Sequence, residues 1–159
     1  MGGPWTVYFQ QGRGAPASAT FDKLISWSDS SDEGVKYFSG KGTYTRTIEA
    51  KPKWFANGST LRLDLGDVRN LAVVTLNGNE LGTVWHAPYR VNVTRALKPG
   101  SNQISVTVIN AWVNRLIGDQ QPDSSKMYTF TSWKSYSAKS PLQPSGLLGP
   151  VTLLSESQK

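Results

Sequence analysis

The sequence predicts an all-β fold, an antiparallel β-sandwich. Its 15 glycines and 9 prolines separate short runs rich in Val, Thr, Leu, Ile, Tyr and Trp, which is typical of antiparallel β domains. Residues 43–48 and 103–109 alternate between polar and apolar side chains with a period of two. Asn77 and Gly78 lie between two apolar runs and predict a two-residue hairpin, because both positions of a type I′ turn need positive φ. Little of the chain is left for helices.

The remaining strands follow from shorter patterns. They are expected at residues 61–65, 71–76, 80–85, 89–93 and 149–154, with a turn at 98–102. The run at 71–76 is more continuously apolar than the others, which predicts a strand covered on both faces. In the last run Pro150 stands at the start of the strand, where its missing N–H does least harm. Residues 110–145 show little alternation, and a loop of this length in a compact domain is usually functional.

Length and composition set limits on the domain and its chemistry. A chain of 159 residues fits one domain over 1–159, and its longest apolar runs are far shorter than the ~20 residues of a membrane helix. No cysteine is present, which excludes disulfides and thiolate chemistry, and His86 alone cannot build a multi-histidine metal site. We expect Met1-Gly2-Gly3 to be an added start joined to an internal boundary of a longer protein.

The net charge of +6 favours acidic partners: nucleic acid, an anionic membrane or an acidic polysaccharide. The basic residues are dispersed rather than clustered, and no nucleic-acid-binding motif is present, so we expect neither nucleic acid nor a membrane as partner.

Several motifs share their order and spacing with a known family. Residues 63–85, with the turn Leu76-Asn77-Gly78 and the return Leu81-Gly82, resemble the sugar-binding domain of glycoside hydrolase family 2. The resemblance continues through 88–94, 97–102 and 108–110, and it includes Gly3-Pro4-Trp5 and 37–40. The motifs at 112–119 and 144–151 are most similar to the C-terminal domain of glycoside hydrolase family 106, the α-L-rhamnosidases.

This resemblance implies a galactose-binding-like jelly roll that accompanies a catalytic domain in bacterial polysaccharide breakdown. In these families the catalytic carboxylates lie in a barrel, and this chain shows no alternation of strands and helices that would build one. We therefore expect the domain itself not to be an enzyme. Its expected partners are a glycan and the catalytic glycoside hydrolase domain of its parent chain, in a secreted or periplasmic protein.

Carboxylate pairs are the chemical alternative to that expectation, because glycoside hydrolysis needs two carboxyl groups roughly 5–10 Å apart. The available pairs are Asp64 with Asp67, Asp119 with Asp123, and Asp32 with Glu33. Asp67 is expected to cap a turn before the hairpin, and Asp32 and Glu33 to be solvated. A structural calcium is also possible, with Asp22 or Asp29 as ligands, although no Asp-x-Asp-x-Asp loop is present. No other cofactor is expected.

The long loop carries the first candidate sugar-binding residues, Trp133, Lys134 and Tyr136. No acidic residue lies between Asp123 and Glu156, and lysines alternate there with aromatic residues, including Phe130. Sugars stack their C–H faces on aromatic rings and bind polar side chains through their hydroxyls. The alternative is that Phe130 and Trp133 fold back as a lid on the sandwich.

Two further clusters are candidates for carbohydrate binding. Trp112 could stack on a sugar while Asn114 and Arg115 hydrogen-bond it; alternatively, Arg115 and Asp119 pair to brace the loop. Trp85 and His86 end the return strand and are expected at a loop edge near the long loop, where the imidazole could bind a hydroxyl. The alternative is an ordinary surface histidine.

Two functions follow from these patterns. The first is a non-catalytic carbohydrate-binding module that holds its parent enzyme on plant polysaccharide, with acidic pectic glycan favoured by the positive charge. The second is a structural accessory domain that buttresses the catalytic barrel and binds no sugar by itself.

Overall fold

The computed structural model describes residues 1–122, 124 and 126–156. Short helical segments lie among eleven named strands in the described part of the chain. The strands are β1 (Trp5–Phe9), β2 (Ser18–Phe21), β3 (Lys41–Ala50), β4 (Thr60–Asp64), β5 (Asp67–Arg69), β6 (Leu71–Leu76), β7 (Asn79–Val84), β8 (Arg90–Asn92), β9 (Gly100–Ile109), β10 (Gly146–Gly149) and β11 (Thr152–Glu156). The helices are α1 (Glu33–Lys36) and α2 (Val113–Gly118), with 3-10 segments η1 (Trp27–Asp29) and η2 (Pro52–Gly58).

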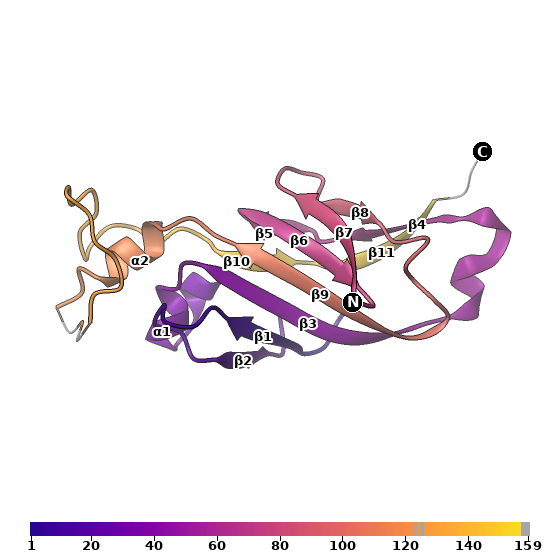
Figure 1. Cartoon of the computed structure of the whole chain (residues 1–159), viewed down its shortest axis with the longest axis horizontal. Coiled ribbons are helices and arrows are strands. Elements are labelled where there is room, and N and C mark those ends of the chain that lie inside the picture. Colours follow the sequence, from indigo (N-terminus) through magenta and orange to yellow (C-terminus); the bar gives the residue numbers. More distant parts are fainter. Residues whose placement is uncertain (123, 125, 157–159) are drawn as a thin grey trace.

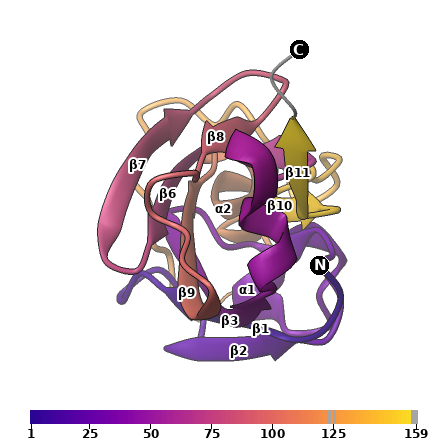
Figure 2. The same ribbon diagram turned by 90° about the vertical axis from the view of Figure 1, so that its right-hand side faces the viewer.

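The strands form two layers with the core between them (Figures 1 and 2). One layer is a six-stranded sheet in the order β2-β1-β3-β9-β6-β7. The other layer consists of β11-β4-β8 and β10-β5. Every pairing between named strands is antiparallel, which confirms the predicted all-β sandwich. At one end of the sandwich lie α2 and the long loop, and at the other end lies η2 (Figure 1).

The strongest sequence patterns produce the longest pairing. β3 and β9 align over ten residues, from Lys41 opposite Ile109 to Ala50 opposite Gly100. The predicted hairpin is confirmed between β6 and β7, where Asn77 and Gly78 have φ of 52° and 81°. The period-two alternation therefore identified the two central strands, β3 and β9. The Asn77-Gly78 turn identified the pairing of β6 with β7.

Other expectations differ from the structure. The outer face of β6 is half-buried, so the prediction that this strand is covered on both faces is wrong; it lies in an antiparallel sheet with one face on the core. Gly149-Pro150 separates the expected final strand into β10, which pairs with β5, and β11, which pairs with β4. The proline lacks an N–H and cannot continue either ladder.

An aromatic cluster fills the core beneath the end that carries α2. Trp27 is fully buried, stacks on Tyr44 at 6.0 Å between ring centroids, and meets Phe9 and Phe38 edge to face. Gly146 has φ of +95°, and a Cβ there would lie 2.6 Å from the Tyr44 hydroxyl oxygen. The strand β10 can therefore approach the aromatic cluster only because residue 146 has no side chain.

The Tyr44→Phe substitution tests this cluster. The Tyr44 hydroxyl accepts a hydrogen bond from the Leu147 backbone N–H at 3.0 Å, and the phenylalanine would leave that buried donor without a partner. The expected loss in the free energy of unfolding is about 1–3 kcal/mol, measured by urea denaturation at pH 7.

A pH dependence should accompany that loss. Burial raises the pKa of Tyr44 above its ordinary value of about 10. The folded chain therefore keeps this proton where the unfolded chain releases it, so wild-type stability should fall above pH 10, by up to about 1.4 kcal/mol per pH unit. The Tyr44→Phe variant should lose this contribution, and an unchanged alkaline slope would contradict the assignment.

Candidate functional site

The candidate site lies at the end of the sandwich formed by α2 and the loop that follows it. Trp112 immediately precedes α2, which buries Asn114, Arg115, Ile117 and Gly118 against the domain. Its C-terminal cap is Asp119, whose backbone N–H donates to the Arg115 carbonyl. This short helix therefore turns two ionisable side chains into the interior.

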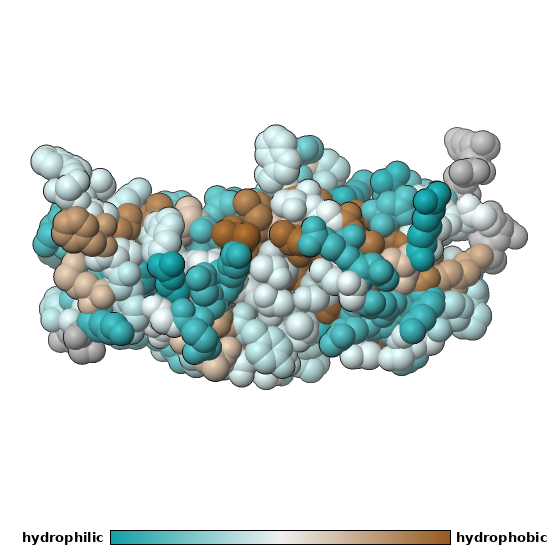
Figure 3. Space-filling view, viewed as in Figure 1, coloured by the Kyte–Doolittle hydropathy of each residue, from teal (hydrophilic) through white to brown (hydrophobic). Residues whose placement is uncertain are grey.

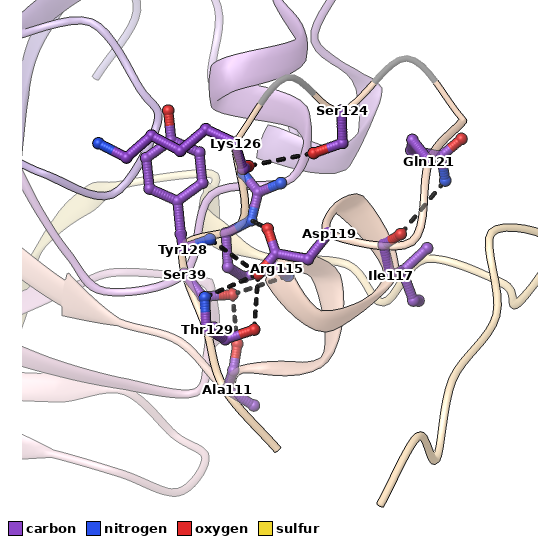
Figure 4. Close-up of polar contacts among 10 residues, drawn as sticks. All are labelled: Ser39, Ala111, Arg115, Ile117, Asp119, Gln121, Ser124, Lys126, Tyr128 and Thr129. Carbon is purple, nitrogen blue, oxygen red and sulfur yellow. Dashed lines mark hydrogen bonds and ion pairs between the residues drawn. The ribbon is translucent and has the colours of Figure 1, made fainter. Parts of the chain in front are cut away.

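Asp119 fixes the start of the long loop (Figure 4). One carboxylate oxygen accepts from the Arg115 Nε–H at 2.9 Å. The other accepts from the backbone N–H groups of Tyr128 at 3.0 Å and Thr129 at 2.8 Å, and from the Thr129 hydroxyl at 2.6 Å. A single buried carboxylate thus joins α2 to the middle of the loop, with charge-assisted hydrogen bonds.

Arg115 is enclosed by aromatic rings and backbone. Its guanidinium carbon lies 4.9 Å from the ring centroid of Tyr128 and 5.9 Å from that of Tyr37. A Cβ at Gly14 would lie 3.0 Å from Nη1 of Arg115, so the β1–β2 connection must also carry a glycine. Only 6% of the Arg115 side chain is exposed. This geometry favours the bracing alternative for Arg115 and Asp119.

A small hollow of about 190 Å³ opens beside Arg115. Its wall includes Glu33, Lys126 and the two tyrosines that enclose the guanidinium. Lys126 carries its ammonium 5.2 Å from the centroid of the Tyr128 ring. Because Arg115 is already paired with Asp119, and the wall carries one further acidic and one further basic residue, Glu33 and Lys126, the charges of this hollow are balanced.

Asn114 fixes the other end of the loop. Its side-chain amide donates to the Gln143 carbonyl at 2.7 Å and accepts from the Gln143 N–H at 2.8 Å. The same amide nitrogen lies 3.4 Å from the Ser145 hydroxyl, and Asn114 is 2% exposed. Asn114 was predicted to bind a sugar hydroxyl, but its side-chain amide instead forms hydrogen bonds with the backbone of the loop.

Bulky aromatic side chains are exposed to solvent on the loop between these two fixed points and at the residue just before α2. Phe130 is 92% exposed, Trp133 79% and Trp112 44%. We call these three residues the aromatic face. Figure 3 shows hydrophobic atoms on the surface at this end of the molecule. The alternative that Phe130 and Trp133 fold back as a lid is wrong, because both rings point away from the core.

Two hollows lie along the aromatic face. The first, of about 390 Å³, includes Trp133, Lys134 and Tyr136, so the three loop candidates are brought together. The second, of about 350 Å³, includes Trp112 and Arg13, whose guanidinium carbon lies 4.5 Å from the centroid of the tryptophan ring. Residues of both hollows include Leu116, Thr129, Phe130 and Thr131.

Sequence reasoning missed Arg13 and Leu116. Arg13 belongs to the β1–β2 connection, and nothing in the sequence links it to Trp112. Leu116 is an apolar residue on the half of α2 that faces the loop, and it could have been found from the helix, had α2 been predicted. Tyr136 also borders a third hollow of about 320 Å³ that contains Asn114.

Trp85 and His86 lie elsewhere. They follow β7 on the connection to β8, midway along the sandwich, and Figure 1 shows this connection well separated from α2 and the long loop. The two rings contact edge to face at 4.7 Å, and Trp85 is 70% exposed. The expected position near the long loop is wrong, because β7 is the edge strand of the six-stranded sheet and its connection to β8 lies midway along the molecule, while α2 and the long loop extend beyond the sheet (Figure 1).

The candidate acidic residues have structural partners. Asp64 forms an ion pair with Arg90 at 2.6 Å and caps the following turn by accepting from the Gly66 N–H. Asp67 pairs with Arg69 at 2.7 Å, so Asp64 is the capping residue that was expected at Asp67. Asp32 accepts from the Val35 N–H and caps α1, rather than being merely solvated. Asp123, predicted as a partner for Asp119, lies outside the described residues.

Within residues 1–122, 124 and 126–156, no three His, Cys, Asp or Glu side chains come together in a group that could hold a metal ion. Of the helices in this range, none is long and apolar enough to cross a membrane.

A family model decides what kind of domain this is. The model described as "Glycosyl hydrolase 2 galactose-binding domain-like" matches residues 27–141, which include strands β3 to β9, α2 and the aromatic face. The chain belongs to this family. The resemblance to the sugar-binding domain of glycoside hydrolase family 2 is therefore confirmed, together with the galactose-binding-like sandwich it implied.

Segments of two larger proteins, each named as a glycoside hydrolase, resemble this galactose-binding-like domain over nearly its whole length. A protein of Formosa agariphila named "Putative beta-glucuronidase" is 38% identical over 96% of the chain. The solved structure of a rhamnosidase from Novosphingobium sp. PP1Y superposes on 98% of the chain with 49% identity and a TM-score of 0.93. The chain spans 15% of the length of each of these two proteins.

More distant structures share the fold. A beta-glucuronidase of Ruminococcus gnavus superposes on 68% of the chain with 21% identity and a TM-score of 0.57. The rhamnosidase match agrees with the similarity of residues 112–119 and 144–151 to α-L-rhamnosidases. The chain therefore corresponds to a small part of each of these larger proteins.

Proposed function

We propose that this domain is a non-catalytic carbohydrate-binding module, which holds its parent glycoside hydrolase on an acidic plant cell-wall glycan through the aromatic face. The observation that carries the proposal is the exposure of Phe130 and Trp133 on a loop held by hydrogen bonds to the buried Asp119 and Asn114, together with the exposed Trp112 that precedes α2. Fixed, exposed aromatic rings on a soluble domain mark a binding surface.

The chemistry of the aromatic face suits a sugar. An aromatic ring offers a flat apolar surface to the C–H groups of a pyranose, while nearby polar groups bind its hydroxyls. Two residues that carry hydroxyls, Thr131 and Tyr136, line the first hollow together with Trp133. Because Asp119 fixes the backbone at Thr129, this arrangement is formed before any ligand binds, which reduces the entropy lost on binding.

The charge of the face favours an acidic sugar. Arg13 and Lys134 are the cations that line the two hollows, and among their described lining residues no Asp or Glu occurs. A carboxylated sugar such as the galacturonate of pectin would meet a complementary potential there. A glycan of this kind lies outside the cell, which supports secretion or periplasmic export of the parent enzyme.

The carboxylates support a non-catalytic role. Asp64, Asp67 and Asp119 are held in ion pairs, and Asp32 caps a helix, so none of these four is poised across a hollow of sugar size. Hydrolysis is accordingly assigned to another domain of the parent chain.

Substitution of the face tryptophans tests the proposal. Trp133→Ala and Trp112→Ala should each weaken binding of this domain to polygalacturonate by at least about tenfold, since each removes a stacking surface. Trp85→Ala is the matched control, because Trp85 is also an exposed tryptophan but lies on the β7–β8 connection. Isothermal titration calorimetry gives the affinities, and thermal melts establish that each variant is folded. Equal binding by all three variants would contradict the proposal.

A second candidate function is a structural accessory domain that packs against the catalytic domain. The exposure of Phe130, at 92%, favours it, because an apolar ring left in water could also be covered by protein. In that case the domain should bind none of the glycans rhamnogalacturonan, homogalacturonan, xylan and β-glucan, and Phe130→Ser should instead lower the melting temperature of the full-length enzyme.

A further inference from the structure

We infer that the glycan crosses Phe130 and places consecutive acidic sugar units on its two sides, one in each hollow of the aromatic face. The inference rests on the proposed function and extends it from a binding surface to a two-subsite site with a minimum ligand length. It also assigns Arg13, at the opposite end of the sequence from the long loop, as a ligand-binding residue.

The two hollows of the aromatic face meet at Phe130. Phe130 belongs to both hollows, as do Thr129 and Thr131 on either side of it in sequence. At 92% exposure its ring rises between them as a ridge. Trp133 lines only the first hollow and Trp112 only the second. A ligand confined to one hollow can therefore meet only one of the two tryptophans.

The ridge has a fixed base. The two residues before Phe130 are held by three hydrogen bonds to the Asp119 carboxylate. Thr129 donates two of them, from its backbone N–H and its hydroxyl, and the Tyr128 N–H donates the third. Asp119 is 1% exposed in its side chain, which protects these hydrogen bonds from water. The division into two hollows is thus a property of the folded loop rather than of one side-chain rotamer.

Each hollow combines one aromatic platform with one cation. In the second hollow the Arg13 guanidinium lies 4.5 Å from the Trp112 ring centroid, and in the first Lys134 follows Trp133 in sequence. This repetition of the same pair of groups favours a ligand whose own units repeat, with a carboxylate on each. A polyuronate has that chemistry, whereas a neutral glycan or one isolated acidic unit uses only part of the site.

Oligogalacturonates of one to four units are suitable probes. We expect monogalacturonate to bind weakly and the affinity to rise at least tenfold at the shortest oligomer that spans Phe130, then to level off, since both hollows are then filled. Trp112→Ala and Trp133→Ala should each return the longest oligomer to within a few-fold of the monomer affinity. Trp85→Ala should retain the full length dependence. Calorimetry of the isolated domain at low salt measures all of these.

Charge-removing variants provide a second readout. Arg13→Gln and Lys134→Gln should each weaken the longest oligomer several-fold and reduce the dependence of its affinity on salt. Lys139→Gln is the matched control, since Lys139 is an exposed lysine of the same loop that lines neither hollow. Its affinity should change less than twofold.

The outcomes separate this inference from the proposed function. Oligomers that bind with one affinity at every length, or a site in which only one tryptophan matters, would overturn the two-subsite inference and leave a carbohydrate-binding module. Neutral oligogalactosides that bind as well as oligogalacturonates would overturn the requirement for acidic units. Failure of every glycan to bind the folded wild-type domain would overturn the proposed function itself.

Discussion

Replacement of Asp119 by alanine is expected to lower the free energy of unfolding by about 3–5 kcal/mol, the usual cost of removing one partner from a buried ion pair. The Arg115 guanidinium would remain in the interior, with 6% of its side chain exposed, and would lose its counterion. The Tyr128 and Thr129 N–H groups and the Thr129 hydroxyl would lose their acceptor at the same time. Urea denaturation followed by circular dichroism measures the change.

Asp67→Ala is the matched control for this prediction. It removes the same type of carboxylate from the same type of partner, but the Asp67 side chain is 39% exposed and that of Arg69 47%. Surface pairs of this kind contribute only about 0–1 kcal/mol, so burial is the variable that distinguishes the two changes. Similar losses from Asp67→Ala and Asp119→Ala would contradict the structural role of the buried pair.

The double variant Asp119→Ala with Arg115→Met separates the charge from the hydrogen bonds. Removing both charges should restore part of the lost stability, because the penalty of an unpaired cation disappears. The part that remains measures the three hydrogen bonds to the loop. Asp119 lines neither hollow of the aromatic face, yet its loss should also weaken glycan binding, since the base of Phe130 is released.

The Gly66→Ala substitution, which adds a single methyl group at a turn, is expected to lower the free energy of unfolding by about 2–5 kcal/mol. Gly66 has φ of +69° and lies against the backbone of Gly149, where the two residues form a bridge between the β4–β5 connection and the end of β10. A Cβ there would overlap the Gly149 carbonyl and lie 2.7 Å from the Pro150 nitrogen. Backbone atoms cannot rotate away as a side chain would.

Gly12→Ala and Gly78→Ala are matched controls for the conformational part of this loss. Their φ values of +75° and +81° are close to that of Gly66, but an added Cβ would meet nothing within 4 Å. Each should therefore lose only the roughly 1–2 kcal/mol of a left-handed backbone conformation. Thermal melts of the three variants compare them directly, and a Gly66→Ala loss no larger than the controls would refute the close contact with Gly149.

The sequence was most informative where local pattern and local structure coincide. β3, β9 and the hairpin at Asn77-Gly78 were predicted because alternation and turn chemistry are properties of adjacent residues. α2 was missed because six residues are too few to show a helical period. β1 also escaped attention, although Trp5, Val7 and Phe9 alternate with more exposed residues along it.

The candidate site was predicted only in part, for a different reason. A bracing pair of Arg115 and Asp119 was considered because both residues belong to one motif shared with the family, whereas the helix that makes them neighbours four residues apart was not predicted. The contacts that fix the loop involve backbone N–H groups of Tyr128 and Thr129, and a backbone donor leaves no mark in the sequence. The approach of Arg13 to Trp112 depends on how distant segments meet, which no local pattern encodes.

Five of the six tryptophans fall into two fluorescence populations, and the sixth, Trp54, is half-buried against the core. Trp5 and Trp27 lie in the core, with Trp27 stacked on Tyr44, so their emission should be blue-shifted and protected from acrylamide. Trp85, Trp112 and Trp133 are exposed and should be quenched readily. A glycan on the aromatic face should shield Trp112 and Trp133 while leaving the core signal constant. One titration can therefore report occupancy and integrity of the fold independently, without an added label.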